Sequence, residues 1–278
     1  MVSSVSNDLK LLLHEQGRLR VWSIIVTIMG DVVETTGGEI SIAELIDICK
    51  LLDIEPQAVR TAMSRLGKEG WVDRIPNGRS TYYRFSDKRR DEFNEATQYI
   101  YANPDTANID WNHGIMPPLN LIEKQMLLDE MASAHPITVN NQIITWRKDY
   151  SGNVPKKIQD LLTIFQEKPI NWGKKCIDQI SPSPQQNLIN ALLQILNSVD
   201  AEEIEAQDAL IVRLLMIHFW RRLVLRHPVV NSPFNEEVWP LPKLHKLVAK
   251  IYALISPKSE AALSRPVNEQ IRNARFQF

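Results

Sequence analysis

Hydrophobic positions recur at helical spacing between residues 56 and 68 and give way to strand-like runs at 71–75 and 81–85. In the helical segment the i, i+3, i+4, i+7 spacing places one apolar stripe on one face, formed by Val59, Ala62, Met63 and Leu66. The two strand-like runs flank Pro76-Asn77-Gly78-Arg79, and Asn-Gly between such runs is typical of a tight hairpin turn. The pattern therefore predicts a helix followed by a two-stranded hairpin.

The residues before this helix predict three further elements. An apolar periodic run over residues 18–33 predicts a core helix, and Gly37-Gly38 and Ile40 predict a break and a short strand. Ser41 with Glu44 three positions later forms a capping-box pattern, which predicts a helix from there to about Leu52. Helix, strand, helix, turn, helix and hairpin is the order of a winged helix-turn-helix, whose second motif helix enters the major groove of DNA.

Charge is concentrated in this segment. Residues 56–90 carry nine basic and three acidic side chains, a net charge of +6, whereas the whole chain has a net charge of −1. A basic patch on a nearly neutral protein favours a localised DNA contact. The candidate DNA-binding residues share the polar helix face or lie on the hairpin: Gln57, Arg60, Thr61, Ser64, Arg65, Lys68, Arg79 and Tyr82. The alternatives are that Arg60 or Arg65 pairs with an acid such as Asp73, and that Arg79 is a solvated turn residue.

The rest of the chain predicts two more domains. Residues 88–101 form a polar connecting helix in this interpretation. Strand-like segments at 99–104, 108–117 and 135–147 alternate with helical ones at 119–133 and 154–168, and the pattern is helical from residue 184 onward. The fold class is therefore α+β and multidomain. The expected division is an N-terminal extension 1–17, a winged-helix domain 18–90, a linker helix with a central α+β domain 91–180, and a C-terminal helical domain 181–278.

Composition narrows the class of protein. A hydrophobic fraction of 44% with 23% charged residues is ordinary for a soluble globular chain. We find no signal peptide and no apolar run near the roughly 20 residues that span a bilayer, so a cytoplasmic protein is expected. Cys49 and Cys176 are too few for a disulfide framework and lack zinc-site spacing. Catalytic motifs and metal-ligand spacing of the six histidines are absent, so the sequence predicts no catalytic residue, metal or cofactor.

Two blocks of sequence resemble the PaaX family of bacterial transcriptional repressors. The first is RVWSIIVTIMGD with GGEISIAELIDICKLLDIEPQAVRTAMSRLGKEGWVDRIPNGRSTYYRFSDK, and the second is IHFWRRLVLRHPVVNSPFNEEVWP. The resemblance implies a ferredoxin-like central domain, a homodimer on a palindromic operator of an aromatic-acid (phenylacetate-type) catabolic operon, and release by an aryl-CoA thioester. Phe219 and His227 stand where the family commonly has acidic residues, so the ligand of this protein is expected to differ if those acids form the pocket.

Several residues are candidates for effector binding. His218, Arg221 and Arg222 lie at i, i+3, i+4 of one predicted helix, where two guanidinium groups can hold the phosphates of coenzyme A. The alternative is that the arginines bridge domains or subunits through carboxylates. Trp146, Arg147 and Trp239 are further candidates, and the favoured alternative for Trp239 is a packing role.

Two other function classes remain open. Likeness of the central domain to small metal-dependent ribonucleases implies a nuclease in which Asp105 and Asp110 bind a divalent cation. The third class is an adaptor whose winged helix contacts a protein instead of DNA. Metal-dependent cleavage lost on mutation of the aspartates identifies the nuclease, and a cellular effect unchanged by Arg60→Ala with Arg65→Ala identifies the adaptor.

Overall fold

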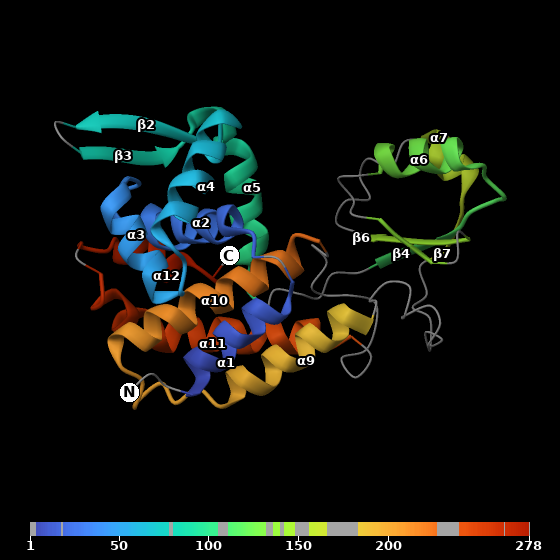
Figure 1. Cartoon of the computed structure of the whole chain (residues 1–278). Coiled ribbons are helices and arrows are strands. Elements are labelled where there is room, and N and C mark those ends of the chain that lie inside the picture. Colours follow the sequence, from blue (N-terminus) through green and yellow to red (C-terminus); the bar gives the residue numbers. More distant parts are fainter. Residues whose placement is uncertain are drawn as a thin grey trace. The chain divides into compact units, whose positions relative to one another are not determined.

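The chain is described here by a computed structural model, which is a mixed, mostly helical α+β structure (Figure 1). The structure describes residues 4–17, 19–77, 80–104, 111–131, 136–139, 142–147, 156–165, 183–226, 239–263 and 265–277. The chain forms two compact units. Unit 1 comprises residues 1–104, 192–227 and 245–278, and unit 2 comprises residues 105–191 and 228–244.

Residues 21–85 of unit 1 form the elements that the sequence pattern of this segment predicts. They are α2 (Val21–Ile28), a π-helical turn η1 (Met29–Val33), a 3-10 turn η2 (Glu34–Thr36), β1 (Ile40–Ser41), α3 (Ile42–Leu51), α4 (Pro56–Lys68), β2 (Val72–Asn77) and β3 (Ser80–Phe85). The strands form an antiparallel sheet in the order β1-β3-β2. The predicted helices, short strand and hairpin are confirmed as elements, with the first helix ending in a π turn.

Local chemistry explains where these helices start and stop. The Ser41 hydroxyl accepts from the Glu44 backbone nitrogen at 3.2 Å, and Glu44 Oε2 accepts from the Ser41 nitrogen at 3.1 Å, so the predicted capping box is present. Gly70, with φ of 72°, supplies the left-handed residue after α4, whereas Gly67 remains inside the helix. The Trp71 nitrogen then bonds to the Leu66 carbonyl at 2.9 Å and directs the chain into β2.

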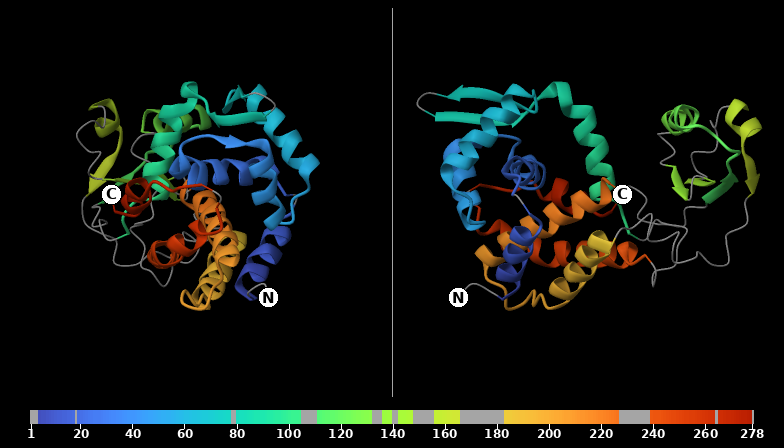
Figure 2. Two further views of the ribbon diagram at one scale, coloured as in Figure 1. Left: turned by 90° about the vertical axis from the view of Figure 1, so that its left-hand side faces the viewer. Right: turned by 45° about the vertical axis from the view of Figure 1, so that its right-hand side comes forward.

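The hairpin is anchored at its base and extends from the helices. Val72 pairs with Phe85, and both side chains are buried, whereas Asn77 and Ser80 near the turn are exposed. Figure 1 and the right-hand view of Figure 2 show β2 and β3 reaching beyond the helices of unit 1. The predicted turn residues Gly78 and Arg79 lie outside the described residues.

Long helices complete unit 1. They are α1 (Ser4–Glu15), α5 (Arg90–Ile100), α10 (Ala206–Val224), α12 (Glu269–Ala274) and the parts of α9 (Ser183–Asn197) and α11 (Leu241–Glu260) that fall in this unit. Residues 208–220 of α10 are all buried, because α1, α2 and α5 pack against this helix. The expected strand at 99–104 is wrong, since α5 continues through Ile100 and the Tyr101 nitrogen bonds back to the Thr97 carbonyl. No helix in the described ranges is both long and apolar enough to span a bilayer.

Unit 2 contains a four-stranded antiparallel sheet and two helices. The elements are β4 (Trp111–Ile115), α6 (Leu121–Glu130), β5 (Ile137–Val139), β6 (Ile143–Arg147), α7 (Lys156–Leu161) and β7 (Thr163–Phe165), with strand order β5-β6-β4-β7. Residues 163–165 were expected to be helical and form a strand instead. A Cβ atom on Gly114 would lie 3.2 Å from the Trp146 ring, so this glycine lets the indole pack into the small core of the unit.

Candidate nucleic-acid interface

One face of α4 is polar and open to solvent. The exposed residues are Gln57, Arg60, Thr61, Ser64, Arg65 and Lys68, and the buried ones are Val59, Ala62, Met63 and Leu66. The buried face packs against α2 and α3. The predicted division of this helix into two faces is confirmed, because all six expected contact residues lie on the exposed face.

The cationic residues on the exposed face of α4 differ in their interaction partners. Arg65 forms an ion pair with Glu69 (Nε to Oε1, 2.7 Å), and its guanidinium carbon lies 5.4 Å from the centre of the Trp22 ring. Arg60 and Lys68 are exposed and form no ion pair with any residue that the structure describes. The Arg65 pair is solvent-exposed and contributes only about 0–1 kcal/mol, so this side chain can exchange its partner for a phosphate.

The hairpin carries further polar groups beside α4. Arg84 lies 4.0 Å from Asp73 and 3.6 Å from Asp87, so Asp73 is close to a hairpin arginine and not to Arg60 or Arg65. Tyr82 is half-buried and pairs across the hairpin with Ile75. The structure therefore brings Tyr82 and the α4 residues into one unit, and Arg79 lies outside the described residues.

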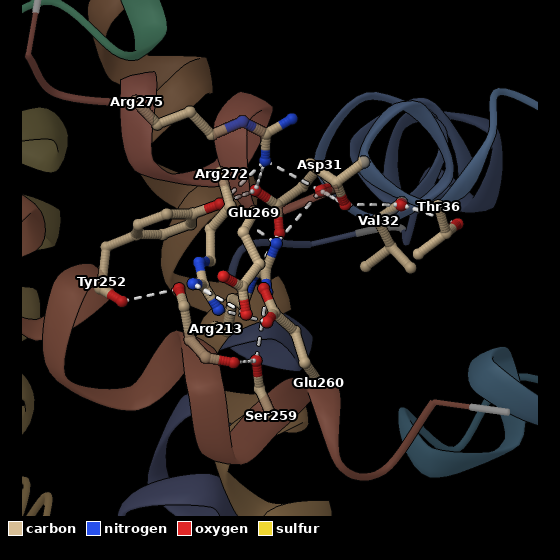
Figure 3. Close-up of polar contacts among 12 residues, drawn as sticks. Asp31, Val32, Thr36, Arg213, Tyr252, Ser259, Glu260, Glu269, Arg272 and Arg275 are labelled. Carbon is tan, nitrogen blue, oxygen red and sulfur yellow. Dashed lines mark hydrogen bonds and ion pairs between the residues drawn. The ribbon is translucent and has the colours of Figure 1, made fainter. Parts of the chain in front are cut away.

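A buried charged centre around Asp31 joins the turn after α2 to the C-terminal helices (Figure 3). Asp31, fully buried in the π turn after α2, accepts from Arg213 Nε at 2.7 Å and from Arg275 Nη1 at 2.5 Å. The hydroxyls of Tyr101 and Tyr252 donate to Asp31 Oδ1 at 2.6 and 3.1 Å. Both arginines also donate to the Asp31 backbone carbonyl, at 3.1 and 2.8 Å, which fits a π turn whose altered pairing leaves carbonyls free for side chains.

The protonation state of this centre follows from its charges. Burial alone would raise the pKa of Asp31, but the two guanidinium groups and the Tyr101 hydroxyl outweigh it and lower the pKa. Burial raises the pKa of both tyrosines. The centre at neutral pH is therefore one carboxylate shared by two arginines, with two neutral phenols completing the hydrogen bonds.

The network continues into α11 and α12. Arg213 Nη1 donates to Ser259 Oγ at 3.1 Å and contacts Glu260 at 3.3 Å, and Glu260 pairs with Arg272 at 2.5 Å. Sequence reasoning missed this centre. A signal was present, since Asp31 and Arg213 are single charges inside otherwise apolar runs, which marks buried paired charges.

Two of the three candidate effector residues on α10 meet at one point of α2. Arg221 donates from Nε to Thr27 Oγ1 at 3.0 Å and from Nη2 to the Ser23 carbonyl at 2.9 Å and hydroxyl at 2.7 Å. His218 Nδ1 lies 3.1 Å from the same Thr27 oxygen. Arg222 is half-buried and has no part in these contacts. Arg221 thus bridges two helices through neutral oxygens, not through the carboxylate that the alternative interpretation invoked.

Burial determines the charge of these groups. It lowers the pKa of His218 well below its usual value, with Arg221 and Arg222 adding to the effect, so this histidine is neutral. Burial, with Arg222, lowers the pKa of Arg221 to about 10. Arg221 still carries its charge at neutral pH.

The remaining candidates are in unit 2 or outside the described residues. Trp146 is 1% exposed in the core of unit 2, and Trp239 is 2% exposed. Arg147 ends strand β6 opposite Trp111. Phe219 is fully buried, whereas His227, Asp105 and Asp110 lie outside the described residues. Among the residues that are described, no group of three or more His, Cys, Asp or Glu could hold a metal ion.

Comparison with known proteins identifies the family. The family model described as PaaX-like protein matches residues 20–89, from the start of α2 past β3. The model described as PaaX-like protein C-terminal domain matches residues 184–265, which include α10 and all of α11. The two matches together cover more than half of the chain. The chain belongs to the PaaX-like family.

One curated relative extends the family match over the central region. This PaaX-family chain is 25% identical over 273 residues to the transcriptional repressor PaaX of Escherichia coli (strain K12), with 87% of this chain and 82% of that protein covered. Among solved structures, the uncharacterized protein Rv0674 from Mycobacterium tuberculosis aligns with a TM-score of 0.46 at 13% identity, covering 86% of this chain and 97% of that one. Asp31 lies in the first matched segment, Arg213 and Tyr252 lie in the second, and Arg275 lies beyond both.

Proposed function

We propose that this PaaX-family chain is a sequence-specific, DNA-binding transcriptional repressor in which unit 1 carries a winged helix-turn-helix. The order of α3, turn, α4 and hairpin, with β1 completing a three-stranded sheet, supports this assignment. The observation that carries the proposal is the exposed polar face of α4. In this interpretation α4 enters the major groove and the hairpin contacts the flanking backbone.

The side chains on the exposed face of α4 are suited to recognising DNA bases. Arg60 has no ion-pair partner among the described residues, so its guanidinium can take guanine O6 and N7, and Gln57 can pair with adenine. Lys68 and Arg65 supply charge for phosphates, and the hairpin adds Arg79 and Tyr82. Phosphate contacts release counterions, so binding is expected to weaken as salt rises.

Kinship with the E. coli repressor supports the biological role. We propose that the chain acts in the cytoplasm as a homodimer on an operator with half-sites about one helical turn apart, and that it represses a phenylacetate-type catabolic operon. An aryl-CoA thioester is the proposed effector, bound by some of Trp146, Arg147, His218, Arg221, Arg222 and Trp239. The strand order and helix positions of unit 2 support a ferredoxin-like domain.

The experiment is fluorescence anisotropy with DNA from upstream of the gene and of neighbouring operons, at two or more salt concentrations. Arg60→Ala should weaken specific binding by about 1–3 kcal/mol, because one base or phosphate contact is lost. Lys250→Ala is the matched control. It removes one exposed cation from α11, which lies away from α4 and the hairpin in Figures 1 and 2, and should change affinity by less than about twofold.

The proposal fails if the wild-type protein prefers no upstream DNA over a scrambled sequence. It also fails if Arg60→Ala and Lys250→Ala weaken binding equally, since charge alone would then explain the affinity. Release of the complex by an aryl-CoA thioester, and not by coenzyme A alone, tests the effector part separately.

A further inference from the structure

A cavity of about 140 Å³ lies inside unit 1, where α2, α5 and α10 meet the base of the hairpin. Its walls are mostly aromatic and apolar, and include Trp22, Trp71, Phe85, Phe93 and Ala96. A protein cavity of roughly 150 Å³ with apolar walls binds benzene, so this space holds one six-membered ring. It is too small for the nucleotide part of a coenzyme A thioester.

Arg221 is one of the polar residues that line this cavity. Its guanidinium is held by Thr27 and Ser23 at 2.7–3.0 Å, and Nη1 has no acceptor among the residues that the structure describes. No described carboxylate forms an ion pair with Arg221. A partly buried cation without a counter-ion is an incomplete arrangement, which a ligand carboxylate would complete by accepting from Nη1.

The acids that line the same cavity are already neutralised. Asp31 is shared by Arg213 and Arg275, and Glu92 accepts from Arg89 Nη1 with both carboxylate oxygens, at 2.7 and 2.8 Å. These pairs leave Arg221 as the unbalanced charge among the lining residues. The local field therefore favours an anion over a cation.

Further cations near Arg221 strengthen this preference. Burial lowers the pKa of Arg222, and so does repulsion from Arg226 and Arg20. Arg20, Arg222 and Arg226 form no ion pair within the described part of the chain. Positive charge without compensation on this side of α10 attracts anions to the cavity.

We propose that this cavity binds a compact carboxylate carrying a single ring, with the carboxylate on Arg221 and the ring among Trp22, Trp71 and Phe93. The ligand would touch the base of the DNA-binding segment. The Trp22 ring carries the guanidinium of Arg65 at 5.4 Å, and the Trp71 ring carries that of Arg89 at 4.8 Å. A ligand that shifts the Trp22 ring therefore shifts a residue of the exposed α4 face. The site goes beyond the proposed repressor function, and its occupancy does not require that the chain bind DNA.

The test is isothermal titration of the full-length protein with benzoate and phenylacetate, compared with the neutral isosteres benzamide and phenylacetamide. Wild-type protein should bind the carboxylates at least about tenfold more tightly than the amides, because only the carboxylates form an ion pair with Arg221. Arg221→Gln should abolish this preference and leave the weaker amide binding within about threefold. The assay contains no DNA, so its failure is distinct from failure of the proposed repressor function.

Three variants separate the site from general charge and from misfolding. Arg222→Gln removes the neighbouring charge outside the lining and should change carboxylate affinity by less than about threefold. Ala96→Leu fills the cavity and should weaken carboxylates and amides alike. Arg221→Lys keeps the charge and should restore part of the preference. Circular dichroism and thermal melting establish that each variant is folded.

The proposal is overturned if wild-type protein binds the carboxylates no more tightly than the amides. It is equally overturned if Arg222→Gln loses as much affinity as Arg221→Gln, or if Ala96→Leu binds as the wild type does. Either of the last two results would place the ligand outside this cavity.

Discussion

Replacing Asp31 by Asn tests whether the buried charged centre holds the N-terminal segment to the C-terminal helices. The substitution removes the charge that Arg213 and Arg275 share and leaves two guanidinium groups that are 0% and 4% exposed. Removing one partner of a buried ion pair costs about 3–5 kcal/mol, because the other charge stays buried without compensation. At about 2–4 °C per kcal/mol for a domain of 150–250 residues, the melting temperature should fall by about 6–20 °C.

The measurement is urea and thermal unfolding followed by circular dichroism, with Asp47→Asn as the matched control. Asp47 pairs with Lys50 at 2.8 Å, but both side chains are more than half exposed. An exposed pair contributes about 0–1 kcal/mol, so the same chemical change there should have little effect on the free energy of unfolding. Local hydrogen exchange in α2 and α12 would show whether the two sides of the centre separate before global unfolding.

A double-mutant cycle with Arg213→Met separates charge pairing from packing. Once Asp31 is Asn, removing Arg213 should cost less than it does in the wild type, since among the described side chains the buried arginine then keeps only its longer 3.3 Å ion pair with Glu260. The reasoning is refuted if Asp31→Asn destabilises no more than Asp47→Asn, or if the effects of the two substitutions simply add.

Two further predictions follow from buried titratable groups. The contribution of His218 to the free energy of unfolding should be complete above about pH 6.5, its unfolded-state pKa, and should fall by about 1.4 kcal/mol per pH unit as the pH drops toward its lowered folded-state pKa. In urea unfolding between pH 5 and 7, His218→Gln should remove this pH dependence of stability. An unchanged pH dependence would contradict the neutral state assigned to His218. Burial raises the pKa of Cys49 to about 12. In a Cys176→Ser variant the Cys49 thiol should therefore react with a disulfide reagent only as fast as the protein unfolds. Rapid labelling of the folded protein would show that Cys49 is accessible to solvent.

The elements between residues 21 and 85 could be predicted from the sequence because the forces that form them are local. The buried stripe of α4, the capping box at Ser41 and the β2–β3 hairpin each depend on residues that lie near one another in the sequence. The same method was less accurate at residues 99–104 and 163–165, where short apolar runs fit a strand or a helix equally well. Neighbouring elements decide such cases.

The sequence by itself also determined the placement of the candidate DNA-binding residues on α4, since helical periodicity alone sends them to the face opposite the core. Only the tertiary structure decided which charges meet in the interior. Asp31 contacts arginines that lie 182 and 244 positions away, and Arg221 reaches neutral oxygens on α2 instead of a carboxylate. A lone charge in an apolar run indicates that a partner exists, but the identity of the partner depends on how distant helices pack. Local pattern carries no information on that packing.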